Sequence, residues 1–278
     1  MKKIFFNDEF FNIKDTLECG QIFRYYFENN GYYVFSKDKA AFCCNNNGKV
    51  ELCCEEQDFE YFNNFFDTQR DYKEIYQKAV QEGGLLSISA ENGKGIHILN
   101  QDIEETIFSF IISQNNNIPR IKMIIERLCC ALGNKKTFNN KEFFTFPSAH
   151  VIAKQNLSFF KEIGLGYRAE YILSFAKSIS NGYLLNYLIN LKTPELKQEL
   201  LKIYGIGPKV ADCICLFAFH RSDCFPVDTW IEKVYRENYN GTLKNREQIS
   251  KFFTNKFKNN SGYFQQYLFH HKRNLEKN

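Results

Sequence analysis

A short glycine turn between two helix-forming stretches constrains the fold of this chain more than any other feature. Residues 200–216 contain Gly205 and Gly207, followed at once by Pro208 and Lys209. Glycine permits a positive φ, and proline fits the first position of a helix. The segment, about residues 199–219, therefore predicts a helix, a tight turn and a second helix. Backbone N–H groups at the start of the second helix can bind a phosphate oxygen.

This turn pattern is also typical of an ordinary connection between two helices. It does not match a dinucleotide-binding motif, because no third glycine follows at the required spacing and the preceding residues are helical. Asp228 follows Lys209 by 19 residues. Taken alone, Lys209 could be only a phosphate contact and Asp228 only a helix N-cap. The residues by themselves leave these alternatives open.

The remaining pattern predicts an α+β fold, with an N-terminal antiparallel β-rich domain (1–100) followed by a mainly α-helical domain (101–278). Residues 32–35, 41–44 and 50–53 are β-prone runs separated by turn formers. After residue 57 the apolar residues recur with a helical period. Helices are expected at 104–112, 118–132, 168–179, 194–203, 209–219, 228–238 and 246–257. The boundary is placed after the glycine-rich residues 91–95.

Charge is unevenly distributed along the chain. Residues 1–100 carry 11 Lys and Arg against 16 Asp and Glu, whereas residues 101–278 carry 25 against 16. A basic C-terminal part attracts polyanions, although a solvated basic surface without function has the same composition.

Six of the ten cysteines form adjacent pairs, a pattern that favours free thiols in a reducing compartment over disulfides. No run reaches the roughly 18 apolar residues of a membrane span. We expect a cytoplasmic protein of a bacterium, associated with the nucleoid, neither secreted nor bound to a membrane.

The motifs together resemble a known family. The run Gly-x-Gly-x-Lys-Val-Ala-Asp-Cys-Ile-Cys-Leu at 205–216, with Asp228 after it, is similar to the helix-hairpin-helix (HhH-GPD) glycosylase superfamily, and within it to the 8-oxoguanine DNA glycosylase/lyases. The resemblance extends to residues 20–24, 110–121 and 164–169, in the same order, and covers about residues 17–270. It implies a base-excision repair enzyme that acts on double-stranded DNA containing 8-oxoguanine, preferably opposite cytosine.

The resemblance also implies a mechanism, in which Lys209 and Asp228 are catalytic. The enzyme flips the damaged base out of the duplex, and Lys209 attacks C1′ of its sugar to form a Schiff base. β-Elimination of the 3′ phosphate then nicks the strand. A lysine must be neutral to attack, so we expect the helix dipole and burial to lower the pKa of Lys209. Asp228 is expected near the sugar, where its charge stabilises the oxocarbenium-like transition state, rather than in a salt bridge with Lys209.

Further roles follow from the same resemblance. The backbone carbonyl of Gly20 is expected to accept the N7–H that 8-oxoguanine has and guanine lacks, while Gln265 contacts the Watson–Crick edge. Cys213 and Phe269 are expected to stack on the two faces of the base. Asn115 would fill the vacated stack with Tyr167 wedged beside it, and the opposite cytosine would be read by two arginine forks. The complete set comprises Gly20, Cys213, Phe217, Gln265 and Phe269 for the base; Asn115, Arg120, Tyr167 and Arg168 for the opposite strand; and Gly205, Gly207, Val210 and Trp230 for phosphates.

Two positions depart from the family pattern, and two other classes of protein are alternatives. Phe217 stands where the animal and fungal members of the family carry methionine, and Trp230 stands where they carry histidine. No cysteine follows Cys224, so an iron–sulfur cluster is not expected, and no zinc-type spacing is present. We expect no cofactor or metal, with a monovalent or divalent cation at the hairpin left open, and a monomer. The alternatives are a DNA-binding protein without catalysis and an enzyme for other oxidised or alkylated purines.

Overall fold

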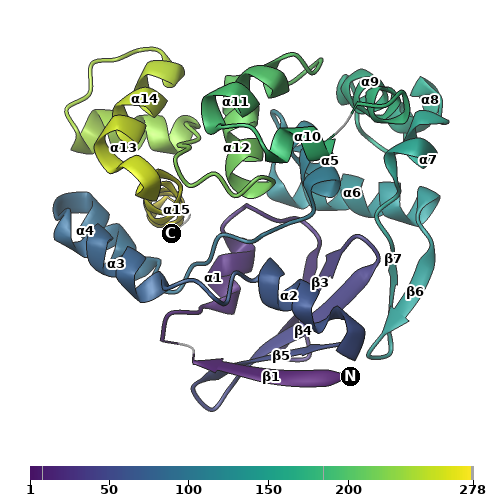
Figure 1. Cartoon of the computed structure of the whole chain (residues 1–278), viewed down its shortest axis with the longest axis horizontal. Coiled ribbons are helices and arrows are strands. Elements are labelled where there is room, and N and C mark those ends of the chain that lie inside the picture. Colours follow the sequence, from purple (N-terminus) through teal and green to yellow (C-terminus); the bar gives the residue numbers. More distant parts are fainter. Residues whose placement is uncertain (8, 184, 277–278) are drawn as a thin grey trace.

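The N-terminal part is built on a five-stranded antiparallel sheet. The computed structural model describes residues 1–7, 9–183 and 185–276. The strand order is β1-β5-β4-β3-β2 (Figure 1). The strands expected at 32–35, 41–44 and 50–53 are confirmed as β3, β4 and β5, and sequence analysis missed the two edge strands β1 and β2. The bounds are β1 Lys2–Asn7, β2 Tyr25–Glu28, β3 Gly31–Ser36, β4 Lys39–Asn46 and β5 Lys49–Cys54.

Both faces of this sheet are covered. On one face Val34, Val50 and Leu52 form a core with α1 (Ile13–Glu18) and with phenylalanines of α2 (Phe59–Phe65), which follows the short helix η1 (Glu56–Asp58). On the other face Tyr33 and Phe35 pack against Phe138 and Phe143. These two phenylalanines belong to a two-stranded hairpin, β6 (Lys135–Phe138) and β7 (Lys141–Phe144), that sequence analysis did not predict. The hairpin reaches down to the sheet from the helical part (Figure 1).

The rest of the chain is mainly helical, which confirms the predicted fold class. All seven expected helices are present, and their ends differ from the predicted ones by no more than two residues. Both α5 and α12 are largely buried, and α5 packs against α6, α9 and α12. Within the described residues no helix is long and apolar enough to cross a membrane. The remaining bounds are α3 Tyr72–Gln81, α4 Gly84–Asn92, α5 Ile103–Ser113, α6 Ile118–Leu132, α7 Ala149–Ala153, α8 Leu157–Glu162, α9 Arg168–Ser180, α10 Leu185–Ile189, α11 Thr193–Leu201, α12 Pro208–Phe217, α13 Thr229–Asn238, α14 Arg246–Phe257, η2 Lys258–Asn260 and α15 Ser261–Leu275.

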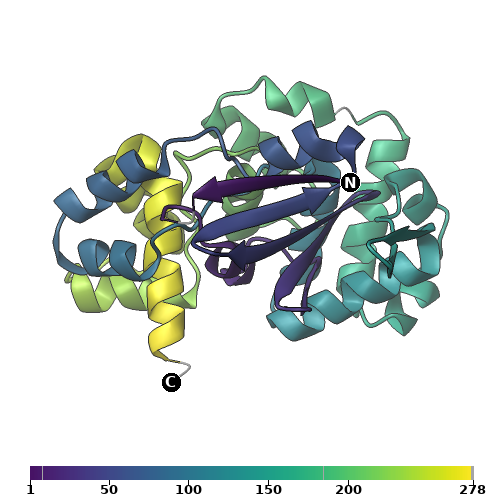
Figure 2. The ribbon, with the colours of Figure 1, turned by 90° about the horizontal axis from the view of Figure 1, so that it is seen from below.

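The packing does not divide at residue 100. Tyr72 and Ile75 of α3 and Leu86 of α4 belong to the same hydrophobic core as Phe264 and Tyr267 of α15. Figure 2 shows α3 and α4 beside α15, on the far side from the β6–β7 hairpin. A cut at residue 100 would therefore leave part of the helical core on the N-terminal side. All ten cysteines are free, as expected.

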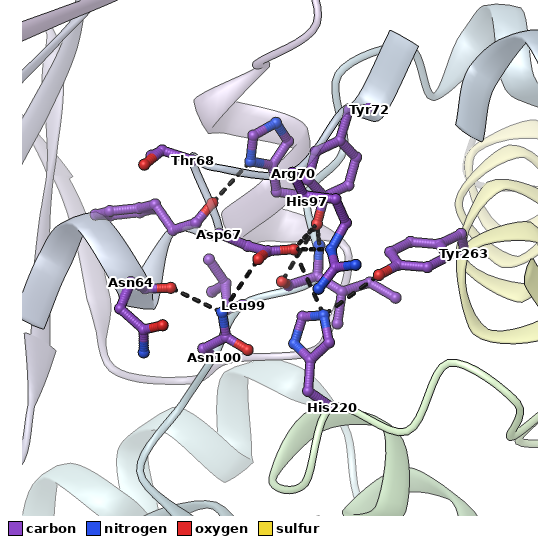
Figure 3. Close-up of polar contacts among 12 residues, drawn as sticks. Asn64, Asp67, Thr68, Arg70, Tyr72, His97, Leu99, Asn100, His220 and Tyr263 are labelled. Atoms are coloured by element: carbon purple, nitrogen blue, oxygen red, sulfur yellow. Dashed lines mark hydrogen bonds and ion pairs between the residues drawn. The ribbon is translucent and has the colours of Figure 1, made fainter. Parts of the chain in front are cut away.

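A buried polar cluster joins the two parts of the chain (Figure 3). Its centre is Asp67, which follows α2 and has a φ of +50°. Its carboxylate accepts hydrogen bonds from the hydroxyl of Tyr72 at 2.9 Å and from Nδ2 of Asn100 at 3.3 Å, and it pairs with Nε of Arg70 at 2.5 Å. Nε2 of His220, from the loop after α12, lies 3.5 Å from the same carboxylate. One acidic side chain thus connects the sheet domain, α3 and the loop that precedes Asp228.

We expect Asp67→Asn to lower the free energy of unfolding by about 2 kcal/mol, because the carboxylate serves several donors in a buried place. Asparagine tolerates the positive φ, so the backbone should not be strained. Urea unfolding of the two proteins measures the difference. Glu74→Gln is the control, because Glu74 forms an exposed i,i+4 pair with Lys78 that contributes at most about 0.5 kcal/mol. Equal losses in the two variants would contradict a special role for Asp67.

Candidate active site

The glycine turn lies between α11 and α12, as the sequence predicts. Gly205 has a φ of +88°, and a Cβ built there would lie 2.2 Å from Cγ of Tyr171, so a larger residue fits neither the backbone nor the space. Gly207 is the N-cap of α12 and leaves open space where a side chain would be. Pro208 has no N–H, and the first-turn N–H groups that follow, including that of Val210, have no acceptor within the helix. The turn therefore offers backbone donors to an anion.

A cavity of about 60 Å³ opens beside the first turns of α12. It is lined by both predicted catalytic residues and by all five residues predicted to recognise the base, although Gly20 and Phe269 are about 250 positions apart. The other four lining residues were not predicted from the sequence. Two of these are chain neighbours of predicted residues, and one stands in the segment before Asp228. The full lining is Cys19, Gly20, Phe110, Lys209, Cys213, Phe217, Pro226, Asp228, Gln265, Gln266 and Phe269.

Helical spacing aims these side chains at one space. Lys209, Cys213 and Phe217 stand at i, i+4 and i+8 on α12, so they share a face of the helix. The ring of Phe217 stacks on Phe110 of α5 with centroids 5.4 Å apart and an interplanar angle of 9°. The aromatic ring at position 217 therefore lies flat against α5. This stacking gives the phenylalanine a packing role at a position where the family pattern has methionine.

Gln265 leaves a hydrogen-bond acceptor available in the cavity. Its Nε2 donates to the carbonyl oxygen of Pro226 at 3.2 Å. Its Oε1 is buried and has no partner among the described residues. An unsatisfied buried acceptor costs about 1–3 kcal/mol, so this carbonyl is suited to a ligand that brings a donor.

The pKa of Lys209 is shifted in the direction opposite to the expected one. The pKa of Lys209 is raised, because the sulfur of Cys213 next to it and the carboxylate of Asp228 outweigh the lowering effect of burial. The prediction of a lowered pKa is therefore wrong for this structure. Burial raises the pKa of the Cys213 thiol above its usual value, in spite of the nearby ammonium.

Asp228 caps a helix and also faces Lys209. It is the N-cap of α13, where its Oδ1 accepts a hydrogen bond from the N–H of Ile231 at 2.9 Å. It also lies close enough to Lys209 for the charges to interact, and burial raises the pKa of the Asp228 carboxyl. The capping role, considered from the sequence as an alternative to catalysis, is thus compatible with a place in the cavity. Trp230 lies in the first turn of the same helix, with Nζ of Lys233 5.1 Å from its ring centroid.

The four residues predicted to meet the opposite strand gather at a second place. Asn115 is exposed, with a φ of +45°, in the connection between α5 and α6. Tyr167 is half-exposed, and the Arg168 guanidinium lies 4.5 Å from its ring centroid. Arg120 is exposed and its Nη2 donates to the carbonyl oxygen of Gly164 at 3.2 Å. Arg120 therefore keeps most of its donors toward the surface.

Arg168 is engaged differently from Arg120. It is only 3% exposed. Its Nε donates to the carbonyl oxygen of Gln114 at 2.7 Å, and its Nη2 donates to that of Asn115 at 2.8 Å. In this structure Arg168 holds the turn that presents Asn115, a contact that sequence analysis did not predict. Within the described residues no group of three or more His, Cys, Asp or Glu side chains is placed to hold a metal ion.

Comparison with known proteins finds matches over both parts of the chain. Residues 3–107 match the family described as 8-oxoguanine DNA glycosylase, N-terminal domain, and residues 108–259 match the HhH-GPD superfamily of base excision DNA repair proteins. A probable N-glycosylase/DNA lyase of Methanothermobacter thermautotrophicus is 31% identical over 228 residues, which cover 75% of this chain and 72% of the relative.

Two solved structures are similar over nearly the whole chain. The 8-oxoguanine glycosylase/lyase of Clostridium acetobutylicum, in complex with double-stranded DNA containing cytosine opposite 8-oxoguanine, has a TM-score of 0.91 and 36% identity, and the match covers 96% of this chain and 93% of that one. A protein named MBOgg1, in complex with a low-affinity DNA ligand, has a TM-score of 0.93 and 32% identity, with 99% and 97% covered.

Proposed function

The chain belongs to the 8-oxoguanine DNA glycosylase family of the HhH-GPD superfamily, and from this premise we propose that it excises 8-oxoguanine, preferably opposite cytosine, and then nicks the strand. Base excision repair by an N-glycosylase/DNA lyase is the activity of the family. The observation that carries the proposal is the cavity, where Lys209 and Asp228 meet the five residues expected to recognise the base.

Recognition begins at the hairpin. Backbone N–H groups at the start of α12 would bind a phosphate of the damaged strand, which places the flipped nucleotide over the cavity. The base would enter between Cys213 and Phe269. The Gly20 carbonyl would accept its N7–H, and the unpartnered Oε1 of Gln265 would accept a donor of the Watson–Crick edge. Guanine has no N7–H, so it would leave the Gly20 carbonyl unpaired in a desolvated place.

Chemistry follows at the sugar. Lys209, after losing a proton, attacks C1′ as the bond to the base breaks, and the Asp228 carboxylate stabilises the positive charge that develops on the sugar. Loss of a second proton from nitrogen and ring opening form the Schiff base. The imine makes the C2′ hydrogen acidic. A proton acceptor removes it while the bond from C3′ to its phosphate oxygen breaks. The departing nucleobase takes up a proton, and water hydrolyses the imine, which frees the amine of Lys209. The products are a released nucleobase and a nicked strand that ends in an unsaturated aldehyde.

Borohydride trapping tests this mechanism, because it reduces a Schiff base to a stable amine. A duplex with one 8-oxoguanine opposite cytosine should give a covalent adduct with the protein, and an undamaged duplex should not. Absence of an adduct, with binding to damaged DNA intact, would leave a monofunctional glycosylase or a DNA-binding protein without catalysis. Base release from a panel of oxidised and alkylated purines distinguishes 8-oxoguanine from the other candidate lesions.

We expect Arg120→Ala to reduce the preference for cytosine over adenine opposite the lesion by about tenfold, because a fork that reads a base edge is lost. Single-turnover base release opposite each base measures the preference. Arg127→Ala is the matched control, since Arg127 is exposed on the same helix and donates to the neighbouring carbonyl of Ile163 at 3.5 Å. An unchanged preference in Arg120→Ala would remove Arg120 from the reading of the opposite base.

The monomeric state, the cytoplasmic location and a cation at the hairpin stay predictions. Gel filtration at assay concentration tests the first of these. Activity after exhaustive chelation and in different monovalent salts tests the cation.

A further inference from the structure

We propose that Arg273, near the C-terminus of α15, is a positioning residue that holds the Gly20 turn in the place where it reads the damaged base. The inference deepens the proposed function and rests on it. Arg273 does not line the cavity, and it would act through Gly20 and Phe269 rather than by touching the base.

α15 presents three residues toward the same region. Gln265, Phe269 and Arg273 stand at i, i+4 and i+8, so they share one face of the helix. The first two line the cavity, and Arg273 lies one turn beyond them. Its guanidinium is 5.3 Å from the ring centroid of Phe269. The ring expected to stack on the base therefore contacts both the cavity and the Arg273 guanidinium.

The same guanidinium binds the turn that carries Gly20. Its Nη2 donates to the carbonyl oxygen of Glu18, the last residue of α1, at 2.6 Å. A cation at a helix C-terminus and a charge-assisted hydrogen bond both stabilise this contact. Nη1 lies 3.5 Å from the position that a Cβ of Gly20 would occupy, so the guanidinium packs directly against this glycine. Gly20 itself has a φ of +88°.

The opposite side of the turn is already held by Gln21. Its Nε2 donates to the carbonyl oxygens of Thr16 and His97, each at 2.8 Å, and its Oε1 accepts from the N–H of Leu99 at 2.9 Å. Gln21 thus binds the turn to neighbouring residues of the N-terminal part. Arg273 connects the turn to α15, which carries the base-recognition residues Gln265 and Phe269. Gly20 and Gln265 can face the same base only if these two elements keep their relative position.

Stability does not account for this arginine. It is only 6% exposed, yet its Nε and Nη1 are buried without a hydrogen-bond partner among the described residues. Burying a charged group with unsatisfied donors is unfavourable, and an apolar side chain of similar length is often as stable or more stable in such a place. Arg273→Met should therefore fold, and its effect on activity can be separated from an effect on folding.

Phe269 and the Gly20 carbonyl have different tasks when a base enters the cavity. Phe269 lines the cavity and is the ring expected to stack on the entering base. Phe269 is partly exposed, and its ring would adjust as the base enters. The Gly20 carbonyl must stay in place while this happens, because one hydrogen bond is expected to separate the lesion from guanine. The bond from Arg273 to the Glu18 carbonyl would keep it there.

Two reactions of the same protein test the proposal. Base release from an 8-oxoguanine duplex needs the base to be read, whereas strand cleavage at a preformed abasic site has no base to read. We expect Arg273→Met to slow base release about 10- to 100-fold, the size of effect that a misplacement of about 1 Å produces. Cleavage at the abasic site should remain at the wild-type rate. Arg273→Lys, which can still donate to the Glu18 carbonyl, should recover most of the base release.

Lys272→Met is the matched control, because the adjacent Lys272 pairs with Glu237 of α13 at 2.6 Å and should leave both rates unchanged. Equal slowing of both reactions by Arg273→Met would show a general structural role and overturn the proposal. Unchanged base release would overturn it as well. A wild-type protein that cleaves abasic sites but releases no 8-oxoguanine would instead contradict the proposed substrate, which separates the two failures.

Discussion

Lys209→Gln is expected to lower both base release and nicking by about 10⁴-fold or more, because the variant has no amine to attack C1′. Glutamine is nearly as long as lysine and remains polar. Gly205, Gly207 and the first-turn N–H groups of α12 are unaffected, so affinity for damaged DNA should change by no more than about threefold. Single-turnover kinetics and a binding titration on the same duplex measure the two quantities.

Lys202→Gln serves as the control for this substitution. Lys202 is an exposed lysine at the end of α11, where it pairs with Glu199 at 2.7 Å. It carries the same charge on the same hairpin, but it does not line the cavity. Its loss should leave base release close to wild type. Base release at the wild-type rate by Lys209→Gln would eliminate Lys209 as the nucleophile, and loss of DNA binding would assign it to the phosphate.

Asp228→Asn should slow base release by about 10²- to 10³-fold, because it removes the charge that stabilises the transition state. The fold should be unaffected, since asparagine caps a helix about as well as aspartate. Asp228→Ala loses the hydrogen bond to Ile231 in addition, and it should lower the free energy of unfolding by about 1 kcal/mol. The pair of variants separates the capping role of Asp228 from its electrostatic role.

The pH dependence gives a second measure of Asp228. Burial raises the pKa of this carboxyl above its usual 3.8, so protonation removes its charge at a pH higher than for an exposed aspartate. Protonation of Lys209 already lowers kcat/KM as the pH falls. Protonation of Asp228, at a pH above 3.8, should add a second and steeper acid limb, and Asp228→Asn should lack this second limb. Wild-type rates in Asp228→Asn, or an unchanged acid limb, would show that Asp228 is only a cap.

The order of the elements and the composition of the site could be predicted to a large extent. The effects of glycine, of proline and of the helical spacing of apolar residues extend over only a few residues. The turn at Gly205 and the seven helices could therefore be predicted from the sequence. The short edge strands β1 and β2 and the β6–β7 hairpin were missed, because their stability depends on partners far along the chain. α15 was not assigned, although its residues Gln265 and Phe269 were named through the family resemblance.

By itself, the sequence determined the hairpin, the helical spacing of Lys209 with Cys213, and the family. Only the tertiary structure decided how Gly20 meets α15, that Arg168 holds the turn of Asn115, and that the Arg273 guanidinium contacts the ring of Phe269. It also decided that the pKa of Lys209 is raised. The physical reason is common to these cases. Local backbone preferences depend on neighbours in the chain, whereas a cavity, an ion's environment and a hydrogen bond between distant segments depend on distances in space and on the loss of water.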